Sequence, residues 1–301
     1  MLYSMQDLQR GLEGHDLVLP SGVKGVWGRG EVMEDIIRRF NDLVSRETKD
    51  DGAQELQYPP VLARSLIEKL GYLDNFPQLA GSVHSFFGKD AEAREIARKA
   101  REGEDWEAML QPTDVMLAPA ACYAVYPNFS GMLPGKGRLI SVTGWVFRHE
   151  PSDEPTRLQS FRMREFIRMG AQEEVVAWRD TWLERGMELL KRLGLDAKSD
   201  VASDPFFGRT GKMMAAQQVE QRLKFEILVP VISHEAPTAV CSFNWHQDHF
   251  SGKFGIRTAG GETAHTACLG FGLERVAIAL INTHGFDPAQ WPADVRKQLW
   301  P

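Results

Sequence analysis

The sequence predicts an α+β fold, and three observations support this. Residues 148–161 contain two strand-like runs on either side of a polar turn with proline and aspartate, which is typical of an antiparallel hairpin. Residues 266–280 begin as a short apolar strand, pass two glycines and continue as an amphipathic helix. Residues 25–47 show the apolar spacing of a long helix.

The helix expected over residues 25–47 has one apolar stripe that should face the core. Its members are Val32, Met33, Ile36, Ile37, Phe40, Leu43 and Val44. A strand is expected after it, over residues 58–61.

Two more helices are expected between and after these elements. Residues 90–103 alternate in charge, which indicates a solvated helix outside the central sheet. Residues 172–193 carry apolar side chains at helical spacing, most of which should belong to the core: Val175, Val176, Trp178, Trp182, Leu183, Met187 and Leu190.

The hairpin carries residues suited to a nucleotide. Alternate strand residues point the same way, so Arg148 and Glu150 should share one face, with Phe161 on the partner strand. An arginine can hold a phosphate, a carboxylate can accept from an exocyclic amine, and an aromatic ring can cover a base. The residues therefore indicate ATP binding, with a cross-strand salt bridge as the simpler alternative.

The strand-to-helix junction near the C-terminus favours an anion. Gly270 and Gly272 permit a tight turn, and Arg275 adds a positive charge in the first helical turn. A Gly-x-Gly pair by itself is weak evidence for phosphate binding.

In this order, the two elements resemble motifs 2 and 3 of the class II aminoacyl-tRNA synthetases, and residues 25–61 resemble motif 1. Residues 241–244, Cys-Ser-Phe-Asn, and residues 255–257, Gly-Ile-Arg, resemble seryl-tRNA synthetases in particular. The resemblance covers nearly the whole chain. It implies one catalytic domain over residues 1–301, an antiparallel sheet of about six strands flanked by helices, and a homodimer formed through motif 1.

The resemblance also assigns roles in ATP binding. Arg148 would bridge the α-phosphate, Glu150 would bind the adenine amine, and Phe161 would cover the adenine face. Arg275 would contact the γ-phosphate, and Arg157 should also reach the triphosphate. Arg148 and Arg275 would thereby act as the catalytic residues, through electrostatic stabilisation of the transferring phosphate.

Magnesium is expected with ATP, and the family holds it with a glutamate before the Cys-Ser-Asn strand. Glu235 is the expected magnesium carboxylate, although its spacing from that strand is slightly longer than in the family. Glu226 is the alternative.

Three further positions suggest a metal. Residues 117–122, Leu-Ala-Pro-Ala-Ala-Cys, resemble a seryl-tRNA synthetase segment in which Cys122 replaces a glutamate. Glu165 and Cys268 match two other positions that, in the atypical methanogen-type seryl-tRNA synthetases, complete a catalytic zinc site. The resemblance therefore implies Zn²⁺ bound by Cys122, Glu165 and Cys268, an accepted set of zinc ligands that leaves one position open.

Simpler roles exist for the same residue types. Each of the three could be a buried structural residue, with Glu165 paired to Arg164 or Arg168. Cys241 is expected in the core. His246, His249 and His265 are possible ligands too, but His246 and His249, at i and i+3 of a probable strand, would face opposite sides. Satisfied polar residues near a cleft are the simpler expectation for these histidines.

Composition limits the partners and the compartment. A chain of 301 residues that is 43% apolar can bury a large core. The net charge of −6 and the pI of about 5.8 have the wrong sign for binding many phosphates, so tRNA is not expected as a partner. No stretch has the length of apolar sequence required for a membrane span, and neither a signal peptide nor a disulfide framework is evident, so a cytoplasmic location is expected.

A seryl-type core with the zinc residues resembles the bacterial amino acid:carrier protein ligases. This implies activation of glycine or alanine as an aminoacyl-adenylate, followed by transfer to the phosphopantetheine thiol of a carrier protein. The alternatives are a non-catalytic sensor of amino acids or ATP, acting as a regulatory subunit, and an enzyme that attaches its amino acid to another macromolecule.

Carrier proteins of this type are acidic, so the resemblance calls for a basic docking surface. The region around residues 204–224 is the candidate, as a helix inserted between the catalytic motifs. Methionines lie within it, flanked by Arg209, Lys212, Arg222 and Lys224. The alternative is a solvated helix that packs its methionines on the core.

Overall fold

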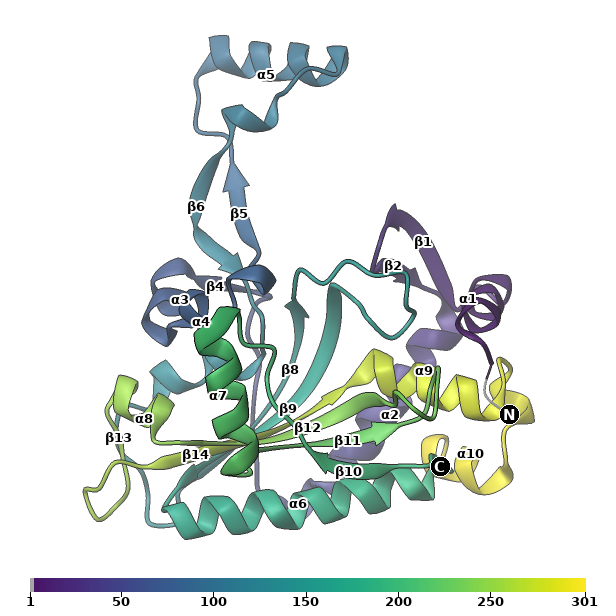
Figure 1. Cartoon of the computed structure of the whole chain (residues 1–301), viewed down its shortest axis with the longest axis vertical. Coiled ribbons are helices and arrows are strands. Elements are labelled where there is room, and N and C mark those ends of the chain that lie inside the picture. Colours follow the sequence, from purple (N-terminus) through teal and green to yellow (C-terminus); the bar gives the residue numbers. More distant parts are fainter. Residues whose placement is uncertain (1–2) are drawn as a thin grey trace.

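The computed structural model describes residues 3–301 and is built around one large sheet (Figure 1). Its order is β10-β11-β12-β14-β9-β8-β3, and every neighbouring pair is antiparallel except β3 and β8. The strands are β3 (Gln54–Leu56), β8 (Arg138–Phe147), β9 (Ser160–Gly170), β10 (Lys198–Val201), β11 (Lys224–Val229), β12 (Thr238–Gln247) and β14 (His265–Gly272). The expected antiparallel sheet is confirmed, with seven strands.

Helices cover one face of this sheet and build the main core. They are α2 (Glu31–Glu47), α6 (Gln172–Arg192) and α9 (Leu273–His284), and Figure 1 shows α6 running along the sheet. Phe166 of β9 stacks on Trp182 of α6 at 5.8 Å between ring centroids. Phe271 of β14 meets Phe40 of α2 edge to face at 5.6 Å. Because alternate strand residues point to opposite faces, these aromatic residues leave the other face free for a site.

The motif 1 region differs from the prediction at both ends. Residues 26–29 form β2 (Val26–Arg29), which pairs with β1 (Val18–Val23), so α2 begins only at Glu31. All the predicted stripe residues are buried except Val32, which is 41% exposed. The strand expected over residues 58–61 is wrong, because Pro59 and Pro60 have no N–H to donate to a ladder. Strands β3 and β4 (Val61–Ala63) lie on either side instead.

The hairpin is longer than expected, and its turn is a loop. Strands β8 and β9 pair from Arg138 to Phe147, and residues 148–159 connect them. Arg148 and Glu150 therefore lie in the loop, and their expected placement on one strand face is wrong. Pro151 and Pro155 lack the N–H groups that would extend the ladder.

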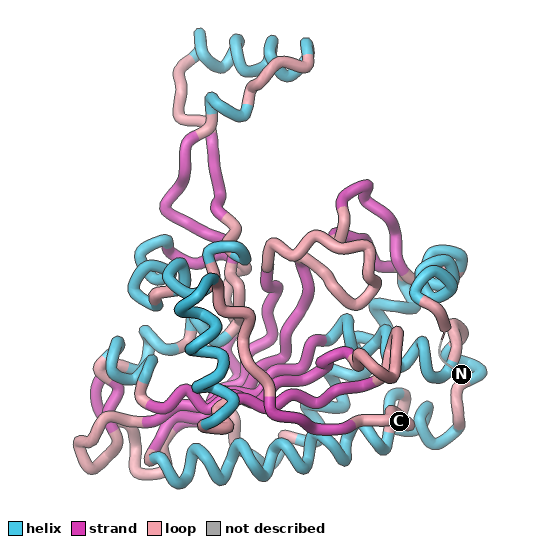
Figure 2. The backbone as a smooth tube through the Cα atoms, viewed as in Figure 1, coloured by secondary structure: helices cyan, strands magenta, loops and turns pink. Residues whose placement is uncertain are grey.

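The charged helix expected over residues 90–103 is α5 (Asp90–Glu102), at the tip of a two-stranded arm (Figures 1 and 2). The arm consists of β5 (Ser82–Ser85) and β6 (Gln111–Leu117), and none of the residues of α5 is buried. Arg98 forms ion pairs with Glu95, Glu102 and Glu104 along its surface. The expectation of a solvated helix outside the sheet is confirmed.

The remaining elements surround the sheet. Helix α6 confirms the prediction for residues 172–193. The other helices are α1 (Met5–Gly14), α3 (Arg64–Leu70), α4 (Tyr72–Asn75), α7 (Gly208–Glu220), α8 (His249–Phe254) and α10 (Ala293–Leu299), and the short strands β7 (Gly131–Met132) and β13 (Ile256–Arg257) pair in parallel. Within residues 3–301, no helix combines the length and the apolar character needed to cross a membrane.

A buried carboxylate ties the helices to the sheet. Glu274 on α9 is 1% exposed and accepts from both the backbone N–H (2.7 Å) and the Nε (2.9 Å) of Arg162 on β9. Arg29 of β2 lies 3.2 Å from the same carboxylate. Arg162 also donates to Glu34 of α2 at 2.7 and 2.8 Å. The network thus joins four elements that are far apart in sequence.

We predict that Glu274→Gln lowers the free energy of unfolding by about 3–5 kcal/mol, because it leaves the largely buried Arg29 without its carboxylate partner and Arg162 with Glu34 alone. Urea denaturation would measure this. Glu95→Gln on α5 is the control, since its ion pair is exposed and should contribute almost nothing. Equal effects of the two substitutions would contradict the importance of the network.

Candidate active site

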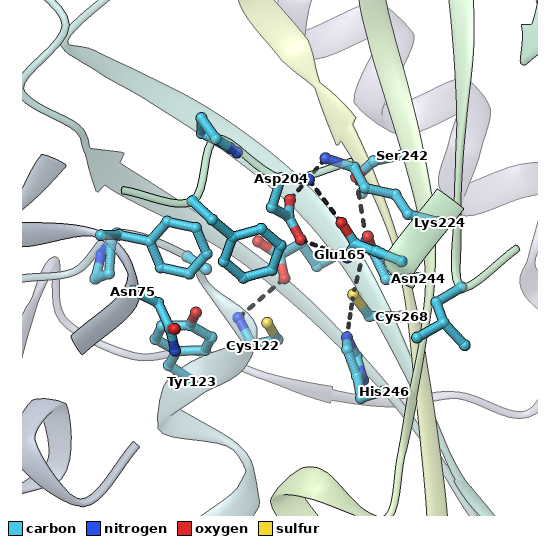
Figure 3. Close-up of a pocket in the computed structure, with 18 of the residues that line it drawn as sticks. Asn75, Cys122, Tyr123, Glu165, Asp204, Lys224, Ser242, Asn244, His246 and Cys268 are labelled. Atoms are coloured by element: carbon cyan, nitrogen blue, oxygen red, sulfur yellow. Dashed lines mark hydrogen bonds and ion pairs between the residues drawn. The ribbon is translucent and has the colours of Figure 1, made fainter. Parts of the chain in front are cut away.

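A cavity of about 450 Å³ opens on the face of the sheet opposite the helical core (Figure 3). Its walls come from the sheet, from α3 and α4, from the turn after β6, and from α7. Alternate residues of four adjacent strands point into it: Lys224 and Glu226 of β11; Ser242, Asn244 and His246 of β12; Phe161, Met163 and Glu165 of β9; and Cys268, Gly270 and Gly272 of β14. Because side chains alternate between the two faces of a strand, every second residue of these strands faces the cavity. Segments that are far apart in the sequence therefore contribute to one site.

The three residues expected to bind zinc meet in this cavity. Cys122, Glu165 and Cys268 are buried, and each offers a ligand atom that lies within 4.8 Å of the other two. Cys122 starts a short 3-10 turn after β6. The Glu165 carboxylate accepts the backbone N–H groups of Ala121 (2.9 Å) and Cys122 (3.0 Å), which holds this turn against the sheet (Figure 3).

The simpler pairings considered for Glu165 are absent from the described residues. Arg164 donates to Thr143 at 3.1 Å, and Arg168 donates to Glu174 at 3.3 Å. Glu165 therefore forms no ion pair with an arginine within residues 3–301, and its charge stays available for a cation.

Gly270 makes room for Glu165. The two residues are cross-strand partners, and a Cβ on Gly270 would lie 3.3 Å from Cγ of Glu165 and 2.7 Å from Cε of Met163. Neither Gly270 nor Gly272 has a positive φ. The expected tight strand-to-helix junction is present, because α9 begins at Leu273 directly after β14, but neither glycine adopts a left-handed conformation there. At Gly270 a side chain would crowd Met163 and Glu165.

Burial and proximity perturb the protonation of this cluster. Burial raises the pKa of Glu165, and the adjacent Cys268 sulfur raises it further. The hydrogen bond between the two sulfurs raises the pKa of Cys122 well above its ordinary value and lowers that of Cys268 well below. A divalent cation would relieve the repulsion among the three groups, so the residues fit a metal.

His246 lines the site, where the sequence analysis expected a satisfied polar residue near a cleft. Its Nε2 lies 3.3 Å from the sulfur of Cys268. The expectation that His246 and His249 lie on one strand is wrong, because β12 ends at Gln247 and His249 begins α8. Alternation from Ser242 and Asn244 was the available signal, since it places His246 on the same strand face.

Positive charge gathers at another part of the cavity. Arg148, Phe161 and Arg275 line it, with the Arg148 guanidinium 5.6 Å from the centre of the Phe161 ring. Arg275 donates to the carbonyls of Thr156 (2.8 Å) and Ala239 (3.0 Å). Burial lowers the pKa of Arg275, and the charges of Arg148 and Arg157 lower it further. Clustered guanidinium groups favour a polyanion.

Three other predicted residues do not line the cavity. Glu150 and Arg157 face each other at 3.6 Å in the loop between β8 and β9. Glu235 is exposed and accepts from the hydroxyl of Ser233 at 2.6 Å, so the structure does not bring it to the site. The alternative, Glu226, borders the cavity from β11.

A buried ion pair closes one side of the cavity. Lys224 lies 2.7 Å from Asp204 and 2.9 Å from Glu226, so its expected place in an exposed basic patch is wrong. Burial opposes the charge of Lys224, but the carboxylates of Asp204 and Glu226 outweigh it and raise the pKa. Gln218 of α7 also binds Asp204, at 2.8 Å.

Helix α7 stands at the edge of the cavity. Met214, Gln217 and Gln218 line the cavity, while Met213 and Val219 are 71% and 44% exposed. The helix expected between the catalytic motifs is present, and it presents apolar side chains to solvent.

Comparison with known proteins identifies the family. No family model matches the chain. Amino acid–acyl-carrier-protein ligase 1 of Bradyrhizobium diazoefficiens is 44% identical over 280 residues, which cover 92% of this chain and 86% of the ligase. A type-2 serine–tRNA ligase of Methanococcus aeolicus is 26% identical over 92% of this chain, which spans 56% of that protein.

Solved structures agree on the fold. The seryl-tRNA synthetase of Methanopyrus kandleri, in complex with tRNASec, superposes with a TM-score of 0.83 at 22% identity, covering 99% of this chain and 61% of the synthetase. That of Pyrococcus horikoshii, in complex with ATP, gives 0.70 at 14% identity, covering 99% and 63%. The expected class II synthetase fold is confirmed. By its identity to the Bradyrhizobium enzyme over nearly the whole of both chains, this protein belongs to the family of amino acid–acyl-carrier-protein ligases.

Proposed function

We propose that this protein activates glycine or alanine with ATP and transfers it to the phosphopantetheine thiol of a carrier protein. The observation that carries this proposal is a single cavity in which a cluster of arginines lies near a buried Cys-Glu-Cys set. The names of the close relatives support an acyl-carrier protein as the acceptor.

Zinc would be held by Cys122, Glu165 and Cys268. Two sulfurs and a carboxylate are suitable donors, and three protein ligands are the pattern of catalytic zinc sites. When bound, the ion would supply a Lewis acid that takes the free amino group of the substrate. The hydrogen bonds from Ala121 and Cys122 keep Glu165 oriented toward the two sulfurs.

ATP would bind at the arginine cluster. Arg148 would hold the α-phosphate, Arg275 the γ-phosphate, and Phe161 would cover the adenine. Once the ion pair between Glu150 and Arg157 opens, Glu150 would contact the adenine amine and Arg157 the triphosphate. Magnesium would accompany ATP, with Glu226 as the carboxylate that already borders the cavity.

The reaction would then have two steps. The amino acid carboxylate attacks the α-phosphate and releases pyrophosphate, which leaves an aminoacyl-adenylate. The carrier thiol attacks the adenylate carbonyl and releases AMP, which leaves a thioester. The arginines stabilise the negative charge that develops in the first step.

A small amino acid fits the walls of the site. Lys224 and Asp204 form an ion pair inside the cavity, with Lys224 7% exposed. A pair satisfied in this way gives no free polar group to a substrate side chain. The pair therefore supports glycine or alanine as the substrate.

The carrier protein would dock on α7. Arg209 and Lys212 lie on its exposed surface, beside Met213 at the same helix end. The exposed positive charges would attract an acidic carrier, and the helix borders the cavity that the thiol must enter. We also propose that two copies of the chain form a homodimer through the region of α2, as the resemblance to motif 1 implies.

The first test is ATP–pyrophosphate exchange with glycine, alanine and serine. We predict exchange with one small amino acid, lost after zinc chelation and in Cys122→Ala, because the amino group then has no site. No exchange with any amino acid, while ATP still binds, would favour the non-catalytic sensor. Exchange followed by transfer to tRNA would contradict the carrier protein as acceptor.

The second test concerns the size of the amino acid. We predict that Asp204→Ala combined with Lys224→Ala raises the ratio of serine to glycine exchange by about 10-fold or more, since a change of this size in a pocket is worth about 1–3 kcal/mol. Removing both partners leaves neither Lys224 nor Asp204 as an unpaired charge, and Glu226, which loses its contact with Lys224, is 22% exposed at the cavity. An unchanged ratio would show that this pair does not set the preference.

The third test separates docking from activation. We predict that Arg209→Glu with Lys212→Glu slows transfer to an acidic carrier protein by about 10-fold at low salt and leaves pyrophosphate exchange unchanged. Arg94→Glu on α5 is the matched control, because this arginine is also exposed on a helix but lies on the arm. Equal transfer by the docking variant and the wild type would place the carrier elsewhere.

A further inference from the structure

We propose that His246 is a positioning residue for Cys268. Its Nε2–H donates to the sulfur of Cys268 and thereby holds that sulfur oriented toward the metal. The inference rests on the proposed zinc site. It assigns a role to a side chain that lines the cavity and contacts one sulfur of the set.

A β-bulge lies at His246, at the end of β12. Strands β12 and β14 pair in regular register from Cys241 to Trp245, but the next pair is Gln247 with Thr266, so His246 is the extra residue. Gln247 has a φ of +53°, a conformation that side chains other than glycine rarely adopt. Bulges are common beside functional sites, and this bulge lies next to the contact between His246 and Cys268.

Thr266 accommodates the tautomer of His246 that donates to Cys268. Its hydroxyl is fully buried and lies 3.1 Å from Nδ1 of the imidazole. A metal-bound sulfur has lost its proton, so its contact with Nε2 at 3.3 Å requires that Nε2 carry the hydrogen. Nδ1 is then the acceptor, and the Thr266 hydroxyl donates to it.

Aromatic packing fixes the ring. Phe250 meets the imidazole at 4.8 Å and 68°, and Tyr126 lies edge-on at 6.3 Å. The hydrogen bond and these contacts leave His246 one orientation. A donor held in this way loses little conformational freedom when it binds the sulfur.

The positions of the ligand atoms make His246 a hydrogen-bond donor to Cys268 and not a fourth ligand of the metal. The ligand atoms of Cys122, Glu165 and Cys268 lie within 4.8 Å of one another, and neither ring nitrogen of His246 belongs to that set. The histidine therefore approaches Cys268 from outside the ligand cluster.

The two sulfurs have different surroundings. Cys268 is approached by Nε2 of His246 and, at 3.5 Å, by Nδ2 of Asn244, whereas within the described chain no side-chain N–H group donates to Cys122. Hydrogen bonds to a thiolate stabilise its charge, and groups of this kind around metal ligands typically change metal affinity 10–100-fold. Cys268 would be the pre-oriented ligand, and Cys122 the one that adjusts.

The test compares three variants by zinc affinity. His246→Phe keeps the ring that packs on Phe250 but removes the donor, while His246→Gln restores an N–H near the position of Nε2. Competition with a chromogenic chelator measures the zinc affinity. We expect this affinity to fall about 10–100-fold in His246→Phe, and we expect His246→Gln to restore most of the lost affinity. His265→Phe is the control, since His265 accepts from Trp245 at 3.2 Å and is not among the residues that line the cavity.

A spectrum provides the second readout. In Co²⁺-loaded protein, loss of the hydrogen bond should move the sulfur-to-cobalt charge-transfer band of His246→Phe to longer wavelength, and His265→Phe should not shift it. Thr266→Val should cause a partial shift in the same direction. Circular dichroism of the metal-free variants separates these effects from misfolding.

The outcomes separate the role of His246 from the proposed zinc site on which that role rests. A wild-type protein that binds no zinc would overturn the proposed metal site. A wild-type protein that binds zinc, together with a folded His246→Phe variant of equal affinity and unchanged cobalt spectrum, would overturn the role of His246 alone. Weaker binding by both His246→Phe and His246→Gln, with no spectral shift, would also overturn it and indicate a packing role.

Discussion

The register of β14 between β9 and β12 is the constraint on which the site depends. It sets Gly270 opposite Glu165 on one side and Cys268 opposite Asn244 on the other. A slip of one residue would turn Cys268 into the helical core and an aromatic residue into the cavity. The apolar face of β14, packed against three helices, makes such a slip costly, so burial on one face holds the chemistry on the other.

Charge is separated within one cavity. Guanidinium groups from a loop and from α9 gather at one part, and a carboxylate with two sulfurs occupies another. Each isolated charge in such a place would be costly to bury. Backbone carbonyls hold Arg275, and backbone N–H groups hold Glu165, so both are oriented without neutralising each other. This arrangement leaves charge available for an anion and for a cation.

Prediction from sequence succeeded where the signal was local or where motifs matched. The apolar stripe of α2, the solvated helix α5 and the position of Arg275 in the first turn of α9 follow from helical spacing. It failed where contacts between distant segments decide. Lys224 resembles a surface lysine until Asp204 is known to face it, and residues 148–159 resemble a short turn until the length of β8 is known.

The sequence by itself determined which side chains are available for the chemistry, because residue types and motif order are properties of the chain. Through the resemblance to the seryl-type synthetases, it indicated Cys122, Glu165 and Cys268 as one set and Arg148 with Arg275 as another. Only the tertiary structure decided that Glu226 borders the cavity and Glu235 does not, and that His246 contacts Cys268. The physical reason is that strand register, bulges and buried pairing depend on contacts between segments far apart in the chain, which local patterns do not specify.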